Sequence, residues 1–249
     1  MKFETKSMSD SKCLSFFLPF YNEEKSLAPV VKTVISVASQ LLTHWEIILV
    51  DDGSSDRSFD IACEMMSRCE NIRIVRLEGN QGFGIAYLRG ISEARFPFAM
   101  YLSTDGDVNE VELKQILFAW DGRRGLIQYA QNPQARFYYR YLLSRWFTRI
   151  TNFLSGNNWP YYNGFNIYRL KEGAQIARLN FGFATQAYVV LNVFNSRSDV
   201  IRIATASKFF DQGSKALTIK NFIRATRFFW FVVRTRVAEV RRSKVTIHG

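Results

Sequence analysis

Two carboxylates one residue apart, Asp105 and Asp107, are the side chains of this sequence best suited to chemistry. They follow an apolar segment, residues 98–102, and the amide Asn109 comes two residues later. Carboxylate and amide oxygens suit Mg²⁺ or Mn²⁺, and Mg²⁺ is usually held by one or two carboxylates together with the phosphates of a substrate. Asp, Asn and Gly are also ordinary turn residues, so a polar loop after a strand is the alternative.

Polar residues follow two earlier apolar segments in the same way. Residues 21–23 come after the segment 12–19, and Asp51 and Asp52 come after the segment 45–50. In an open α/β sheet the carboxyl ends of parallel strands share one edge, and ligands bind there. Because purely structural acids would be scattered, this convergence favours a functional site over a set of unrelated turns.

The elements that must position these groups alternate between strand and helix patterns. Such alternation is typical of right-handed βαβ units and of a largely parallel sheet. We expect strands over residues 12–19, 45–50, 71–77, 98–102, 125–130 and 200–206, and a turn with a short strand over 163–169. We expect helices over residues 24–40, 57–68, 83–94, 111–120, 136–154, 185–195 and 218–242.

The bulk composition indicates a globular α/β chain. It has 249 residues, of which 47% are hydrophobic and 22% charged, and it has three cysteines. An odd number of cysteines without a secretion signal suits a reducing compartment. The longest apolar run near the end, residues 228–233, is far shorter than a bilayer-spanning helix. We therefore expect a cytoplasmic protein, either soluble or peripheral at the inner face of the cell membrane.

The net charge of +11 suits nucleic acid, anionic lipid or phosphorylated substrates as partners. The predicted last helix is amphipathic, with arginines largely outside its apolar stripe. That stripe consists of Ile219, Ile223, Trp230, Val233 and Val237. Such a helix suits a membrane interface. A helix packed on its own domain, with a solvated basic face, fits the same pattern.

Four motifs, in order, resemble glycosyltransferase family 2, and within it the dolichyl- or undecaprenyl-phosphate sugar synthases. The motifs are Leu18–Glu24, Val50–Asp56, Gly79–Ala86 and Asp105–Asn109. The resemblance implies the GT-A fold, a Rossmann-like domain with a mostly parallel central sheet flanked by helices. We expect this domain over residues 1–215 and an amphipathic, basic helical extension over residues 216–249.

The resemblance also implies a donor site for a nucleotide-diphospho-sugar, linked to UDP or GDP. The implied donor residues are Pro19, Tyr21, Asn22, Glu23, Asp51, Asp52, Gly82 and Asp105. The implied ligands of Mg²⁺ or Mn²⁺ are Asp105, Asp107 and Asn109, where Asn stands in place of the Gln of the family motif. Such a metal neutralises charge on the departing nucleotide.

The acceptor side matches the family less fully. Tyr139-Arg140-x-x-x-Ser144 resembles a pattern of the phosphate-lipid synthases, and an arginine pairs well with a phosphate. An arginine expected on the fifth strand is missing, and Ala130 or a neighbour stands there. The implied acceptor residues are Arg136, Arg140, Ser144, Asn163 and Lys215, and the implied catalytic residues are Asp105, Asp107 and Arg140.

Chemistry favours a phosphate acceptor. A hydroxyl acceptor needs a general base, whereas a phosphate is already ionised and needs cations to hold it. The sequence has no Asp or Glu between Glu172 and Asp199, where hydroxyl-type relatives usually place the base. We therefore predict an inverting hexosyltransferase of cell-envelope glycan biosynthesis that uses a polyprenyl phosphate. Transfer to a hydroxyl of a polysaccharide, lipopolysaccharide or glycolipid is the alternative, with Asp211 as its base.

Two other functions fit less well. A nucleotidyltransferase would carry a Gly-rich first loop with Arg or Lys, which residues 19–23 lack. A nucleic-acid-binding protein is disfavoured because the acidic loops at the sheet edge would repel a phosphate backbone. The sugar, the nucleotide and the oligomeric state are not predicted.

Overall fold

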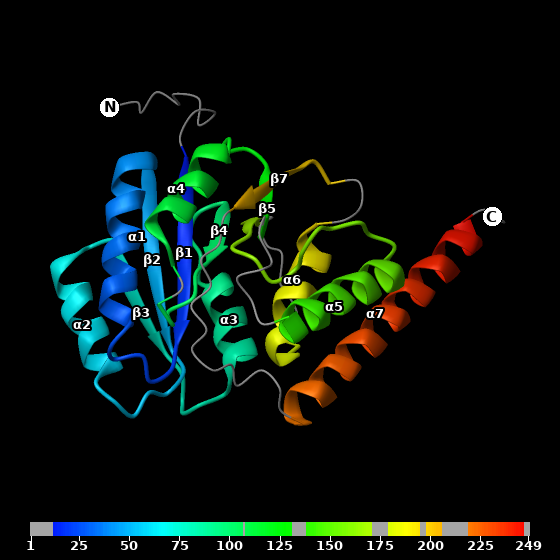
Figure 1. Cartoon of the computed structure of the whole chain (residues 1–249), viewed down its shortest axis with the longest axis horizontal. Helices are drawn as coiled ribbons and strands as arrows, with labels where there is room; N and C mark the ends of the chain where they lie inside the picture. Colours follow the sequence, from blue (N-terminus) through cyan, green and yellow to red (C-terminus); the bar gives the residue numbers. More distant parts are fainter. Residues whose placement is uncertain are drawn as a thin grey trace.

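The computed structural model describes residues 12–106, 108–130, 138–170, 179–194, 198–205 and 219–246. Side chains are described there except those of residues 130, 138–141, 219–222 and 237–246. In this part of the chain, seven strands form one sheet in the order β3-β2-β1-β4-β6-β5-β7 (Figure 1).

The strands are β1 (Cys13–Phe20), β2 (His44–Asp51), β3 (Ile72–Arg76), β4 (Phe98–Tyr101), β5 (Gly125–Ala130), β6 (Ile167–Arg169) and β7 (Val200–Thr205). The helices are α1 (Leu27–Leu41), α2 (Ser58–Arg68), α3 (Phe83–Ser92), α4 (Glu110–Ala119), α5 (Tyr138–Ser155), α6 (Thr185–Val193) and α7 (Ile219–Thr246). A short 3-10 helix, η2 (Gly182–Ala184), precedes α6.

Strand β6 runs against its neighbours in this sheet. β1 pairs in parallel with β2 and β4, β2 with β3, and β5 with β7, whereas β6 is antiparallel to β4 and β5. The expected mostly parallel α/β sheet is therefore confirmed. Strands β1, β2 and β3 end level with one another, because Phe20 pairs with Asp51 and Asp51 pairs with Arg76. The loops that follow them start from one edge.

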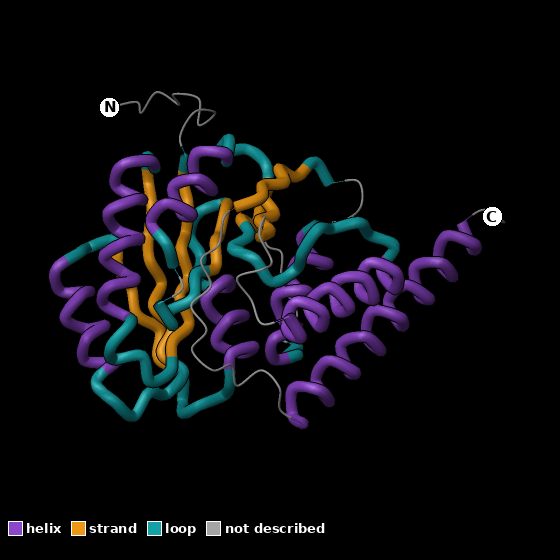
Figure 2. The backbone as a smooth tube through the Cα atoms, viewed as in Figure 1, coloured by secondary structure: helices purple, strands orange, loops and turns teal. Residues whose placement is uncertain are grey.

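Strand β1 lies between β2 and β4 and is buried on both faces, as strands of parallel sheets usually are. Successive side chains of a strand point to opposite faces. Phe16 and Leu18 therefore join one core with α1 and α4, while Phe17 joins a second core with α3 and α6. The sheet lies between these helical layers (Figure 2) and gives the loops at its edge a rigid support.

The expected elements match the observed ones to within a few residues at most ends. Helix α1 is an instructive exception, because it begins at Leu27 and not at residue 24. The amides of Ser26 and Leu27 donate to the carbonyl oxygen of Glu23, at 3.2 and 2.9 Å. A turn therefore comes before the helix, and it keeps residues 21–23 in the loop at the sheet edge.

Helix α7 packs on the rest of the chain with one face. Phe228 and Val232 are buried in the second core, and the ring of Phe228 stacks on that of Phe147 in α5, with 5.7 Å between the centroids. The apolar stripe predicted from the sequence is a different face, and its described members are exposed. These members are Ile223, Trp230 and Val233. The buried face of α7 thus fits a helix packed on its own domain, and the exposed face fits a helix at a membrane interface.

Two expectations concern the end of the chain. The boundary between a domain over 1–215 and an extension over 216–249 falls among residues outside the described part, and it stays a prediction. Within the described residues, no helix combines the length and the apolar character that crossing a bilayer requires.

Candidate active site

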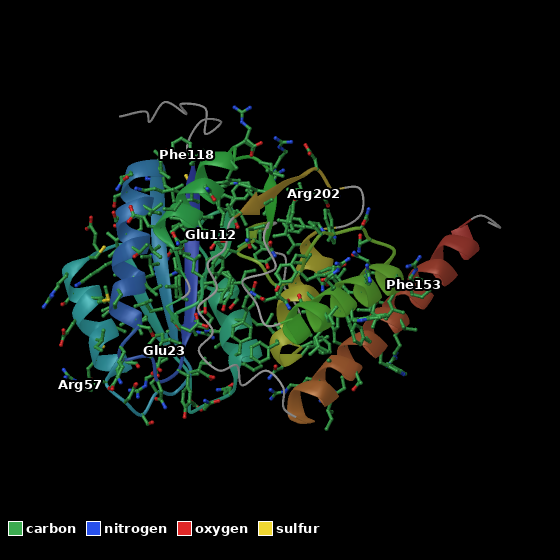
Figure 3. All side chains as sticks on the ribbon, viewed as in Figure 1. Glu23, Arg57, Glu112, Phe118, Phe153 and Arg202 are labelled. Carbon is green, nitrogen blue, oxygen red and sulfur yellow. The ribbon has the colours of Figure 1, made fainter. Side chains whose placement is uncertain are left out.

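The loops after β1 and β2 are joined by hydrogen bonds through Asn22. Its amide donates to Ser54 Oγ at 3.1 Å, and its Oδ1 accepts from the amide of Ser55 at 2.9 Å. Asn22 has a φ of 56°, in the left-handed region that Asn tolerates better than most residues. The amide of Glu23 donates to Ser58 Oγ at 2.6 Å (Glu23 is labelled in Figure 3). The two predicted donor loops therefore form one unit.

The loop after β4 is joined to the same unit. Thr104 is buried, and its Oγ1 donates to the carbonyl oxygen of Pro19 at 3.0 Å. Ser103 Oγ donates to Asp105 Oδ1 at 2.6 Å, and the Asp105 carboxylate is exposed at the edge. The structure thus brings the loops of β1, β2 and β4 together, as the sequence predicts. Tyr21, beside them, exposes 41% of its surface.

The predicted metal ligands are only partly described. Asp107 lies outside the described residues, whereas Asn109 forms the N-cap of α4, and its Oδ1 accepts from the amide of Val111 at 2.8 Å. The described residues contain no group of three His, Cys, Asp or Glu side chains that could hold a metal ion. The exposed Asp105 carboxylate is a hard oxygen donor that fits Mg²⁺ or Mn²⁺. The metal site stays a prediction.

Asp51 is fully buried, although the sequence assigns it to the nucleotide. Its Oδ1 accepts from the amide of Ser54 at 2.8 Å. Its Oδ2 lies 3.1 Å from Arg76 Nε, an ion pair in which the N–H is not aligned for a hydrogen bond. The Arg76 guanidinium lies over the ring of Phe59, 4.0 Å from its centroid. Sequence reasoning missed Arg76, whose place at the end of the third predicted strand was the available signal.

Asp52 holds the turn that precedes α3. It is almost fully buried, and its carboxylate accepts from the amides of Gln81 and Gly82, at 2.8 and 2.9 Å. Burial raises the pKa of Asp52, and the two amide hydrogen bonds oppose that rise. Gly82 has a φ of 89°, which glycine adopts readily. The same turn lies close to Gly53. A Cβ on Gly53 would be 2.5 Å from the backbone of Gly79, so only glycine fits at this position.

A buried polar network supports the turn with Asn163, on the predicted acceptor side. Gln128 Oε1 accepts from the amide of Phe165 at 3.0 Å. Gln128 Nε2 donates to Glu112 Oε1 and to Thr205 Oγ1, at 3.1 and 2.7 Å, and Thr205 Oγ1 donates to Glu112 Oε1 at 2.6 Å (Glu112 is labelled in Figure 3). The sequence analysis missed this network. The sequence did contain an indication of this network, because Gln128 and Glu112 are polar residues within otherwise apolar strand and helix patterns.

The same turn also lies next to β4. The rings of Phe165 and Tyr101, the last residue of β4, have centroids 6.2 Å apart. Asn163 Oδ1 is buried and accepts no hydrogen bond from the described residues. Ser144 is half-buried on α5. The other predicted acceptor residues, Arg136, Lys215 and the side chain of Arg140, lie outside the described part of the structure.

Comparison with known proteins gives a family and partial relatives. The chain matches "Glycosyl transferase family 2" over residues 15–175. It is 38% identical to an undecaprenyl-phosphate 4-deoxy-4-formamido-L-arabinose transferase of Pectobacterium carotovorum over 99 residues, which are 39% of this chain and 30% of that protein. It is 34% identical to a dolichyl-phosphate beta-glucosyltransferase of Trichomonas vaginalis over 98 residues, 37% and 30% of the two chains. These matches span less than a third of either relative.

Solved structures share the fold. S. aureus TarS in complex with UDP has a TM-score of 0.57 and 16% identity, over 88% of this chain and 64% of that one. M. tuberculosis glucosyl-3-phosphoglycerate synthase, in complex with Mn²⁺, UDP and phosphoglyceric acid, has a TM-score of 0.51 and 14% identity, over 78% and 68% of the chains. At such identities the likeness shows the fold alone, and the predicted GT-A fold is confirmed.

Proposed function

The chain belongs to glycosyl transferase family 2 and is a glycosyltransferase, and we propose that it moves a sugar from a nucleotide-diphospho-sugar to a polyprenyl phosphate. The observation that carries this proposal is the joining of three loops, after β1, β2 and β4, around the exposed Asp105 carboxylate. The relatives named above, which are polyprenyl-phosphate sugar transferases, support the choice of acceptor.

The donor half would bind the nucleotide at the joined loops. The exposed ring of Tyr21 offers a flat apolar face for the base, and the loop with Asn22 and Glu23 flanks it. Asp51 and Asp52 are mostly committed to hydrogen bonds within the protein, so their proposed role is to hold these loops in the binding geometry. Gly82, at the start of α3, leaves room for the diphosphate because it has no side chain.

Asp105 and Asp107, with Asn109 beside them, would hold Mg²⁺ or Mn²⁺. When bound, the ion supplies Lewis-acid stabilisation to the departing nucleoside diphosphate. The side-chain oxygen of Asn109 already accepts a hydrogen bond as the N-cap of α4. Its proposed role is therefore to fix the end of the loop after β4, while the two carboxylates bind the ion. The exposure of Asp105 and its hydrogen bond from Ser103 are consistent with this role.

The acceptor half would bind the phosphate through cations. Arg140 and Arg136, with Lys215, would hold its oxygens, and Ser144 and Asn163 would add polar contacts. An acceptor oxygen attacks the anomeric carbon in line, the bond from that carbon to the diphosphate breaks, and its electron pair leaves with the nucleoside diphosphate. The configuration at the anomeric carbon inverts. Because the acceptor is already ionised, this step requires no general base.

The test is nucleotide release from a panel of UDP- and GDP-sugars, with Mg²⁺ or Mn²⁺ and a short-chain polyprenyl phosphate. We expect one donor to give release that requires the phosphate acceptor and stops when the metal is chelated. Arg140→Ala should reduce acceptor-dependent release by about two orders of magnitude, because a charge-assisted pair to the phosphate is lost. The nucleotide-sugar donor should still raise the melting temperature of the Arg140→Ala variant, because the donor site is unchanged.

The matched control is Arg169→Ala. Arg169 is exposed and pairs with Phe98, the first residue of β4, so it lies at the opposite edge of the sheet. This variant should release nucleotide at the rate of the wild type. Release that requires a glycan hydroxyl in place of the phosphate, or an Arg140→Ala variant with full activity, would overturn the proposed acceptor.

The polyprenyl acceptor is embedded in a membrane, so the proposal includes peripheral contact with the cytoplasmic face of that membrane. Among the described residues, the exposed stripe of α7 is compatible with such a contact. The proposed role is a step in the synthesis of cell-envelope glycans.

A further inference from the structure

Large apolar side chains are exposed along two neighbouring helices, α5 and α7. On α5 the most exposed are Trp146, at 59%, and Phe153, at 83%. Leu143 and Ile150 complete a stripe with them, since residues at these spacings share one side of a helix. On α7, Trp230 is exposed at 62%. The docking face, as we call it, consists of Leu143, Trp146, Ile150, Phe153, Ile223, Trp230 and Val233.

The docking face is not required to hold the two helices in place. Packing uses other sides of the helices, where Phe147 of α5 contacts Phe228 and Phe229 of α7, with ring centroids 5.7 and 5.5 Å apart. Phe228 also meets Phe181, with 5.6 Å between the centroids. The exposed stripe is therefore an additional apolar surface, and exposed groups of large apolar side chains often mark an interaction site in a folded protein.

The positive charge of the protein is concentrated on these same helices. Within the bounds of α5 there are three arginines and no acid. Within α7 there are eight Lys and Arg residues and one acid, Glu239. The two helices together contain eleven basic residues and one acid, and so carry +10 of the net charge of +11. Figure 1 shows them side by side at one end of the molecule, away from β3 and α2.

We propose that the docking face binds the surface of an anionic lipid bilayer, with α5 and α7 lying together in the interface. This inference rests on the proposed function, because a polyprenyl acceptor is reached at a membrane. Aromatic and aliphatic side chains enter the boundary between headgroups and acyl chains, and the surrounding arginines pair with anionic headgroups. Arg234 illustrates the arrangement, because its guanidinium lies over the Trp230 ring, 4.8 Å from the centroid.

The first turns of α7 relate this face to the active site. Arg224 Nη2 lies 4.0 Å from the position that a Cβ on Gly82 would take, and Gly82 belongs to the predicted donor site. Ile223, the neighbour of Arg224, is part of the docking face. A bilayer bound by α7 would therefore lie near the edge where the sugar is transferred.

Two other partners fit the docking face less well. A second copy of the chain would bring two strongly positive surfaces together, which is unfavourable. A nucleic acid would pair with the arginines but would not cover exposed Leu143, Ile150 and Val233, because sequence-tolerant nucleic-acid sites use aromatic platforms and cations. Of these three partners, the bilayer surface matches both the aliphatic residues and the charge.

The test is co-sedimentation of the full chain with vesicles of phosphatidylcholine alone, or of equal amounts of phosphatidylcholine and phosphatidylglycerol. We expect binding to the anionic vesicles, weakened by salt, and little binding to the neutral ones. The double variant Trp146→Ser, Phe153→Ser should lose binding by about tenfold or more, since two large apolar side chains no longer enter the interface. Its thermal unfolding should match the wild type, because both side chains are exposed.

The matched control is Phe118→Ser on α4. Phe118 is exposed at 74%, comparable to Phe153, but the two residues lie far apart on the molecule (Figure 3). This variant should bind the vesicles as the wild type does. Equal loss in the control and in the double variant, equal binding to neutral vesicles, or concentration-dependent self-association abolished by the double variant would each overturn the proposal.

The vesicles contain neither sugar donor nor acceptor, so this result is independent of the proposed reaction. Transfer to a short-chain polyprenyl phosphate in solution separates the two claims. The double variant should retain that activity and lose activity on the same acceptor embedded in anionic vesicles. A chain that binds vesicles but never transfers sugar would refute the proposed function and leave the docking face intact.

Discussion

Asp52 is subject to two opposing influences, both visible in its contacts. Burial disfavours its charged form, while the amides of Gln81 and Gly82 stabilise it. Burial is the larger of the two, so the pKa of Asp52 is raised above its ordinary value of 3.8. In the interval between these two pKa values the native state binds more protons than the unfolded state. Acidification through that interval therefore favours the native state as far as this group is concerned.

This argument predicts the pH dependence of the Asp52→Asn variant, which cannot titrate at this position. The difference in free energy of unfolding, wild type minus variant, should be larger at about pH 4 than at about pH 7. Urea unfolding of both proteins at the two pH values measures it. A difference that shrinks on acidification would mean that the amide hydrogen bonds outweigh burial and that the pKa is depressed.

At the scale of elements, Gln128 links β5 to α4, to β7 and to the turn with Asn163. Gln128→Leu leaves the Phe165 amide without its acceptor and removes one donor from the Glu112 carboxylate, which keeps its hydrogen bond from Thr205, and a buried unpaired group costs about 1–3 kcal/mol. The free energy of unfolding should fall by that amount. The KM for the acceptor should rise while the KM for the donor stays constant, because the affected turn is on the predicted acceptor side.

The conservative control is Glu112→Gln, which keeps an oxygen for Gln128 and Thr205. It should lose less stability than Gln128→Leu and keep the acceptor KM of the wild type. Urea unfolding and steady-state kinetics measure both effects. If Gln128→Leu loses stability without any change in the acceptor KM, the network supports the fold but does not position the acceptor turn.

At the scale of the whole molecule, α7 has one face inside the fold and another outside it. Phe228 is fully buried, so Phe228→Ala should lower the free energy of unfolding by about 3–5 kcal/mol. Trp230, two residues away, is mostly exposed. Trp230→Ala should therefore change the free energy of unfolding by less than about 0.5 kcal/mol. Urea unfolding monitored by far-ultraviolet circular dichroism compares the two.

The same pair tests how α7 relates to the predicted domain over residues 1–215. A large, cooperative loss in Phe228→Ala would make α7 part of the same folding unit as the sheet. A Phe228→Ala variant as stable as Trp230→Ala would show that α7 detaches without cost to the sheet, as a separate extension would.

The sequence by itself determined the order of the elements and the edge of the sheet at which the candidate site lies. Alternating apolar patterns specify strands and helices locally, and polar residues directly after strands must emerge at the carboxyl ends. Asn22, Asp52 and Asp105 were placed at this edge in this way, and the structure has them there. The resemblance of the chain to glycosyltransferase family 2 is likewise carried by local motifs, and the match over residues 15–175 confirms the family.

Only the tertiary structure decided which partners these residues have. The ion pair of Asp51 with Arg76 depends on the register of β2 and β3, and the Glu112–Gln128–Thr205 network joins segments distant in sequence. Periodicity showed that α7 has an apolar stripe but could not show which face would be covered. Burial depends on what the rest of the chain places against a helix, and here Phe147 and Phe181 cover Phe228 while Trp230 remains exposed.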